Sequence, residues 1–133
     1  MLLNQLSENS KNLFLNLEVF LANVDGEYSE SEDRIIRMHC KEMGLEIIQY
    51  NENVMLEDIF KNINSEMTVK EKKIIFIELL AVVFIDGVYD DREKEFIENL
   101  RKLLYIPENV GQQAFDMVKK LVDVSLAIES FVE

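Results

Sequence analysis

Two short acidic segments hold the residues of this chain that are best suited to chemistry. Residues 25–33 contain five acidic side chains and no basic one, and residues 86–95 contain five acidic side chains with Arg92 and Lys94. The segments carry charges of −5 and −3, which is −8 of the net −12. Hard cations such as Ca²⁺ take about 6 to 8 oxygen ligands, which clustered carboxylates and turn carbonyls supply. The segments therefore predict a weak site for Ca²⁺ or another divalent cation.

The spacing within each segment differs from that of an EF-hand. An EF-hand loop has glycine at its sixth position, whereas Gly26 and Gly87 stand second, directly after Asp25 and Asp86. An aspartate at the end of a helix also faces the negative end of the helix dipole, at a cost of about 0.3–1 kcal/mol. Two such aspartates favour a role beyond helix termination, although each could instead accept hydrogen bonds from the turn amides that follow it.

The two acidic segments are copies of one pattern. Residues 25–32 read DGEYSESE and residues 86–93 read DGVYDDRE, so Asp, Gly, Tyr and Glu recur at identical spacing 61 residues apart. The flanking apolar residues match as well. The matched pairs are Leu21 with Val82, Val24 with Ile85, Ile36 with Ile97, Met43 with Leu104, and Leu45 with Ile106. The sequence predicts two units, each made of a helix, an Asp-Gly turn and a second helix.

Six helices are expected to position these turns, because apolar residues recur at intervals of three and four along most of the chain. Capping boxes predict helix starts at Ser29 and Thr68, where a glutamate follows three residues later, and Gly44 predicts a left-handed helix end. The expected helices cover about residues 3–23, 29–43, 55–63, 68–85, 90–104 and 107 to the C-terminus, with breaks at 64–65 and near 123–125.

The fourth of these helices is expected to be central. From Ile74 to Ile85 every residue except Glu78 is apolar, so this segment has no face suited to solvent. A carboxylate in such surroundings must be paired, protonated or at a surface groove, and pairing or snorkelling is the simpler interpretation of Glu78.

Composition supports one all-α domain over residues 1–133. The 133 residues are 48% hydrophobic and 30% charged, which is an ordinary globular balance. One proline and four glycines leave too few turns for a β-sandwich or barrel. We therefore expect a helical bundle of two pseudo-repeated units around the central apolar helix.

Charge and targeting signals restrict the partners and the location. A net charge of −12 repels nucleic-acid backbones and anionic lipid surfaces, so neither is an expected partner. The longest apolar run, Leu79 to Ile85, is far shorter than the ~20 residues that span a bilayer. Cys40 is the single cysteine and Met1 to Lys11 has no signal-peptide pattern, which favours a cytoplasmic setting.

The doubled Asp-Gly-x-Tyr pattern between two helices resembles the TerB-like family, which is associated with tellurite resistance. The match covers about Glu18 to Leu45 and Leu79 to Ile106. The resemblance implies an intracellular all-α domain without known catalysis, which binds a divalent cation through its acidic turns and serves stress-response complexes at the membrane. The metal-site residues that it implies are Asp25, Glu32, Asp86 and Glu93.

A structural interpretation of the same residues stays open beside the metal site. Glu32 and Glu93 stand where a capping box places its glutamate, so helix capping alone could account for them. His39 and Cys40 are neighbours about 100° apart on a helix and cannot grip one metal by themselves, so we interpret them as packing residues. With one histidine, one cysteine and no phosphate-binding loop, the usual nucleophilic and nucleotide-binding arrangements all lack parts.

The sequence therefore favours a non-enzymatic TerB-like module that presents an acidic face to protein partners in a stress-linked assembly. Two alternatives stay open: a hydrolase that uses Asp25 or Asp86 with Glu78, and a purely structural domain that forms a homodimer. A pocket with two carboxylates and apolar walls would favour the first, and a large exposed apolar patch the second.

Calcium should raise the stability of the purified chain if the acidic segments bind it. A site with Kd ~1 mM in ~10 mM Ca²⁺ stabilises the native state by about 1.4 kcal/mol. In a domain of this length the melting temperature should rise by roughly 3–6 °C, measured by circular dichroism.

The control separates a bound ion from general screening of the acidic chain. NaCl at matched ionic strength should reproduce only part of the rise, and Asp25→Asn combined with Asp86→Asn should remove the rest. An equal response to both salts, or an unchanged response of the double variant, would show that these segments are helix caps only.

Overall fold

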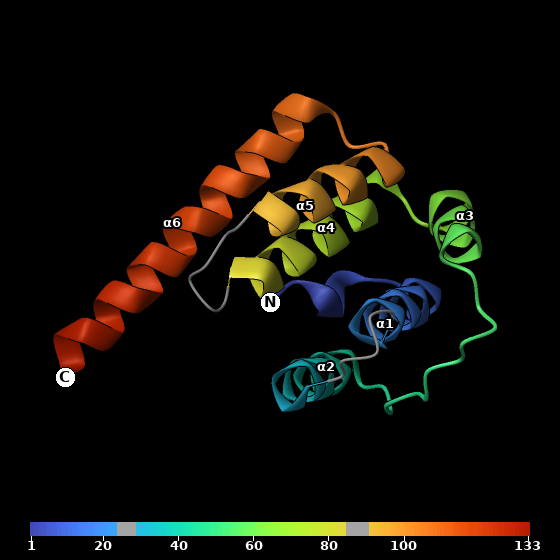
Figure 1. Ribbon diagram of the computed structural model, residues 1–133, viewed down its shortest axis with the longest axis horizontal. Coiled ribbons are helices and arrows are strands. Elements are labelled where there is room, and N and C mark those ends of the chain that lie inside the picture. Colours follow the sequence, from blue (N-terminus) through green and yellow to red (C-terminus); the bar gives the residue numbers. More distant parts are fainter. Residues whose placement is uncertain (24–28, 85–90) are drawn as a thin grey trace. The chain divides into compact units, whose positions relative to one another are not determined.

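The chain is all-α. The computed structural model describes residues 1–23, 29–84 and 91–133, and within these residues it contains helices and loops but no strand (Figure 1). The predicted turn residues Asp25, Gly26, Asp86 and Gly87 and the predicted cap Asp90 lie outside the described residues. The elements are η1 (Leu3–Gln5, a 3-10 turn), α1 (Glu8–Asn23), α2 (Glu30–Met43), α3 (Leu56–Glu66), α4 (Val69–Phe84), α5 (Asp91–Leu103) and α6 (Glu108–Val132).

The structure divides into two compact units, Met1–Ile75 and Phe76–Glu133, with the boundary inside α4. The expectation of one domain over residues 1–133 stays a prediction.

In the first unit α1 packs against both α2 and α3, and η1 contacts α2. The side chains at these contacts are large and almost fully covered, as burial of apolar area requires. The fully buried apolar residues are Leu3, Phe14, Leu15, Leu17, Ile36, Ile63 and Ile75. Cys40 is buried among them, as predicted for a small apolar residue.

A single carboxylate joins the starts of two helices in this unit. Thr68 and Glu71 form the predicted capping box: the Glu71 N–H donates to Thr68 Oγ1 over 3.1 Å, and the Thr68 N–H donates to Glu71 Oε1 over 3.2 Å. The second oxygen of Glu71 accepts the N–H of Ser7, which directly precedes α1, over 2.9 Å. Glu71 is buried. Burial raises its pKa, but the Ser7 and Thr68 N–H groups and the Ser10 and Ser7 side chains lower it by more, so the net shift is downward.

α4 has the burial that its composition predicts. No residue from Ile74 to Phe84 is exposed, and Leu80 is fully buried. The arrangement of the other helices around α4 stays a prediction, because this helix belongs to both units.

Several predicted helix limits need correction. The first helix starts at Glu8, after a separate 3-10 turn, and not at Leu3. The third continues through the predicted break at residues 64–65. Pro107 is the N-cap of α6 with extended backbone (φ −59°, ψ 149°) and not its first helical residue. α6 runs uninterrupted through residues 123–125, because one aspartate and one serine lower helix propensity by only a few tenths of a kcal/mol each.

The local structure repeats with the 61-residue interval. α4 begins 61 residues after α1 begins. Gly44 ends α2 in the left-handed conformation, and Tyr105, which is 61 residues later, has φ 55°. Both ends have the same hydrogen bonds, since Leu45 N–H donates to Cys40 O and Ile106 N–H to Arg101 O. The twofold relation between the two copies stays a prediction.

Replacing Glu71 by glutamine should destabilise the chain by about 1–3 kcal/mol, because an amide cannot accept from both helix starts with charge-assisted bonds. The pKa of Glu71 is lower when folded than when unfolded, so its stabilisation is complete above the unfolded value, ~4.3, and is lost as pH falls through the folded value. Urea denaturation of both proteins should therefore show a difference at neutral pH that shrinks below about pH 4.

Glu52→Gln, at an exposed loop position, is the matched control and should change the unfolding free energy by less than about 0.5 kcal/mol. A Glu71→Gln effect that is as small as the control's, or that is the same at every pH, would contradict this role.

Candidate functional site

The predicted metal residues are only partly described. Asp25 and Asp86 lie outside the described residues. The Glu32 N–H donates to Ser29 Oγ and its carboxylate accepts from the same hydroxyl, each over 3.1 Å, so Glu32 caps α2 as predicted. Glu93 lies half-buried in the first turn of α5 and makes a polar interaction. Within residues 1–23, 29–84 and 91–133 no three His, Cys, Asp or Glu side chains could hold a metal ion together, and the cation site stays a prediction.

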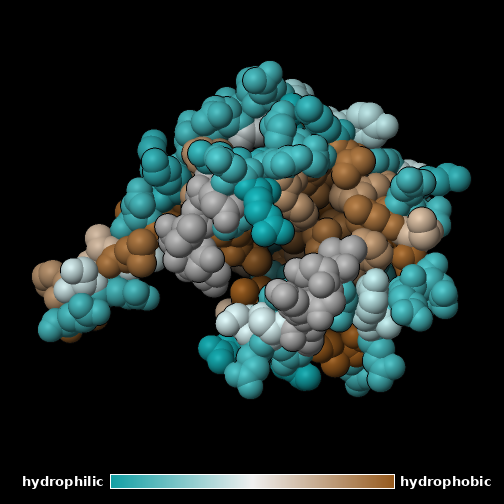
Figure 2. Space-filling view, in the orientation of Figure 1, coloured by the Kyte–Doolittle hydropathy of each residue, from teal (hydrophilic) through white to brown (hydrophobic). Residues whose placement is uncertain are grey.

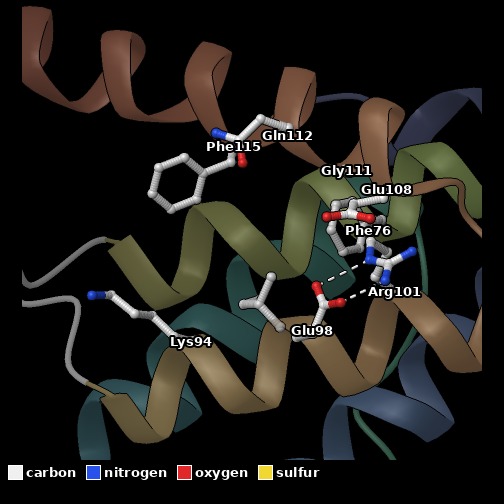
Figure 3. Close-up of a pocket in the computed structure, with 9 residues that line it drawn as sticks. Phe76, Lys94, Glu98, Arg101, Glu108, Gly111, Gln112 and Phe115 are labelled. Carbon is white, nitrogen blue, oxygen red and sulfur yellow. Dashed lines mark hydrogen bonds and ion pairs between the residues drawn. The ribbon is translucent and has the colours of Figure 1, made fainter.

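The second unit contains a groove of about 360 Å³ between α5 and α6, with α4 at its floor (Figure 3). Its walls combine apolar side chains with both acidic and basic ones, so the groove has the two carboxylates and apolar walls that a carboxylate-dependent active site would need. The lining residues that matter here are Phe76 of α4, Glu98 and Arg101 of α5, and Glu108 and Phe115 of α6.

Two charged residues of this groove, Arg101 and Glu98, are bonded to one another. Arg101 donates to both oxygens of Glu98, from Nε over 3.0 Å and from Nη2 over 2.5 Å, and its third nitrogen donates to the carbonyl of Ile106 over 2.8 Å (Figure 3). The bonds from Arg101 lower the pKa of Glu98, which is the wrong direction for a general acid. The pair therefore favours a structural role, closing the turn between α5 and α6.

Gly111 makes this arrangement possible. A methyl group at position 111 would lie 2.6 Å from Cδ of Arg101, closer than carbon atoms can approach. Glycine inside a helix costs about 1 kcal/mol relative to alanine. Here it leaves room for the aliphatic part of the Arg101 side chain to pack against α6.

A buried Glu–His pair lies in the first unit. Glu18 of α1 is buried, and its Oε2 bonds Nδ1 of the half-buried His39 of α2. The Phe14 ring lies 5.8 Å from the imidazole, centroid to centroid. A carboxylate at Nδ1 fixes the orientation and tautomer of an imidazole. His39 therefore packs as predicted, but it also has a charged partner that the sequence reasoning missed.

Cys40, next to His39, does not complete a nucleophilic site. Its pKa is raised, first by burial and then by the negative charge of Glu18. A raised pKa keeps the thiol protonated, whereas nucleophilic cysteines have lowered values.

The 61-residue repeat relates the Glu18–His39 pair to two residues of the second copy of the pattern. Glu18 and His39 correspond to Leu79 and Leu100 of the second copy, both buried, so one copy has a bonded Glu–His pair where the other has two leucines. Glu78 is buried and makes a polar or electrostatic interaction, so it is not a snorkelling side chain. A signal for Glu18 existed, because it lies three and four residues from the core residues Leu15 and Phe14.

α6 carries a separate apolar surface. Its buried residues Gly111, Ala114 and Val118 pack within the second unit, and no residue from 119 to 133 is buried. Exposed apolar side chains nevertheless continue along this end, where Figure 2 shows hydrophobic residues. We name as the α6 stripe the residues Met117 (57% exposed), Leu121 (45%), Val124 (57%), Ile128 (59%) and Phe131 (89%).

Comparisons with protein families, with characterised proteins and with solved structures found no match to this chain. No helix in the described part of the chain is long and apolar enough to cross a membrane.

Replacing Glu18 and His39 together by leucine should leave stability near wild type or raise it, because well-packed apolar residues often replace a buried ion pair at no cost. Glu18→Leu or His39→Leu alone leaves one polar side chain without this partner and should cost about 2–4 kcal/mol. Chemical denaturation of all four proteins gives the coupling energy.

The second repeat unit serves as the reference. Its Leu79 and Leu100 are buried, which shows that the corresponding positions can hold leucine. Additive effects of the two single variants would mean that the contact between Glu18 and His39 contributes no coupling.

Proposed function

We propose that this chain is a non-enzymatic helical module that docks other proteins through the α6 stripe. The observation that carries the proposal is the exposure of five large apolar side chains along one helix. Single exposed apolar residues are normal on protein surfaces, but a continuous row of them is typical of an interaction site.

The position of the stripe on α6 supports this function. Ala114 and Val118 pack within the unit. Leu121 and Ile128 follow Ala114 at intervals of seven residues, on nearly the same side of the helix, but they are 45% and 59% exposed. The apolar side on which α6 packs therefore continues beyond Val118 as an exposed surface.

The bonded polar groups of the two units favour binding over catalysis. Arg101 holds Glu98 in the groove of the second unit, and the Cys40 thiol has a raised pKa. The TerB-like resemblance supports the wider proposal of a cytoplasmic module in a stress-linked assembly, with a divalent cation held by Asp25, Glu32, Asp86 and Glu93.

Site-specific photo-crosslinking in living cells tests the docking function. A photoreactive phenylalanine analogue at position 131 should form protein adducts of discrete mass, because Phe131 ends the stripe and is 89% exposed. Leu121→Gln with Ile128→Gln in the same chain should remove these adducts by taking apolar area from the surface.

The matched control is the same analogue at Leu126, which is 50% exposed on α6 but lies about 140° around the helix from Leu121. Equal adducts from positions 131 and 126, or none from either, would refute a docking role for the stripe.

A further inference from the structure

We infer that the groove of the second unit binds a short peptide with free ends, about three residues long, whose amino group lies at Glu108 and whose carboxylate lies at Lys94. This inference goes beyond the docking function, because it concerns a small ligand and a surface that contains no residue of the α6 stripe. Three observations carry it: the apolar floor of the groove, the charges at its two ends, and the length between them (Figure 3).

The floor of the groove suits an apolar side chain. Its apolar lining consists of the buried Phe76 and Ile97 and the half-buried Phe115. Phe115 is held edge-on against Phe84 of α4, with the ring centroids 5.2 Å apart, so the wall that it forms is fixed by packing. The volume of about 360 Å³ lies within the range of small-molecule sites, roughly 300–1,000 Å³.

Two of the four charged side chains in the lining neutralise each other. Arg101 donates from Nε and Nη2 to Glu98 and from Nη1 to the carbonyl of Ile106, so all three guanidinium nitrogens are bonded. The charges that this pair leaves in the groove are the positive Lys94 and the negative Glu108. A ligand that complements both must carry one negative and one positive group.

Glu108 marks the end of the groove that suits an amino group. It lies beside Arg101 and makes no hydrogen bond or ion pair within the described residues. α5 ends and α6 begins here, so the dipoles of the two helix ends oppose each other. An ammonium group has three donors, and the amide oxygen of Gln112 offers a second acceptor because its nitrogen already donates to Asp116 over 3.0 Å.

Lys94 marks the end that suits a carboxylate. It lies near the start of α5, where the helix dipole also favours an anion. Its ion pair with Asp91 spans 4.0 Å between exposed side chains, and such surface pairs contribute little. Lys94 stands seven residues before Arg101, which is about 10 Å along the helix, and Arg101 packs against Gly111 of α6.

The length between the charged ends selects the ligand. A free amino acid carries both charges on one residue and reaches only one end of the groove. An extended peptide spans at most about 3.3–3.6 Å per residue, so three residues place the amino group and the carboxylate about 10 Å apart. An apolar side chain in the middle of such a peptide then lies over the floor.

Two-dimensional ¹H–¹⁵N NMR of the purified full chain tests the site, with the tripeptide alanyl-leucyl-alanine as the probe. Amides of residues 94–101 and 108–115 should shift and saturate with a Kd of roughly 0.1–5 mM, while amides of α1 and α3 stay in place. N-acetylation or C-terminal amidation of the peptide should each raise the Kd about fivefold, because each removes one charge.

Single variants assign each end of the peptide. Glu108→Gln should raise the Kd of the free peptide about fivefold and leave that of the N-acetylated peptide unchanged, and Lys94→Gln should act in the same way on the free and the amidated peptides. Glu95→Gln and Lys102→Gln, at exposed positions of α5 outside the lining, make the same changes in net charge. These two controls should leave the Kd within about twofold.

The outcomes separate this inference from the docking function. Groove amides that do not saturate at ~20 mM peptide, or shifts spread evenly over the chain, overturn the peptide site. Modified peptides that bind as tightly as the free one overturn the recognition of the charged ends, and an N-acetylated peptide that still loses affinity in Glu108→Gln overturns the orientation. Crosslinks from position 131 would stand under each of these results.

Discussion

A helix in water holds its shape mainly by burying an apolar face, since short isolated helices are marginal even with favourable sequences. α1, α2 and α3 meet this requirement within the first unit, and α4 has no exposed residue from Ile74 onward. α6 meets it only as far as Val118, although the helix continues to Val132. Among the last fourteen residues of α6 no side chain is buried, and the proposed docking function would supply a cover for them.

Local signals predicted much of the fold. The capping pairs Ser29–Glu32 and Thr68–Glu71, the left-handed Gly44 and the apolar α4 depend on residues close in sequence, and each has the expected structure. The bond from Ser7 to Glu71 was not predictable in this way, because it joins residues 64 apart. The pairing of Glu18 with His39 also depends on how two helices pack, which periodicity alone does not specify.

The candidate site was also only partly predictable from the sequence. The sequence placed Met117 and Leu121 on a helical period but gave no sign that one side of that helix stays uncovered, since periodicity marks apolar faces without naming what packs on them. The acidic turns were the clearest chemical signal, and their metal interpretation depends on Asp25 and Asp86, which lie outside the described residues. Glu32 has a capping role that stands without a metal.

Hydrogen–deuterium exchange along α6 of the purified chain tests the central claim most directly. Amides of residues 119–132 should exchange faster than those of residues 108–118, because the unit buries Gly111, Ala114 and Val118 and no residue beyond them. Equal protection of the two halves of α6 would contradict the claim, because the end of the helix would then be covered within the chain itself.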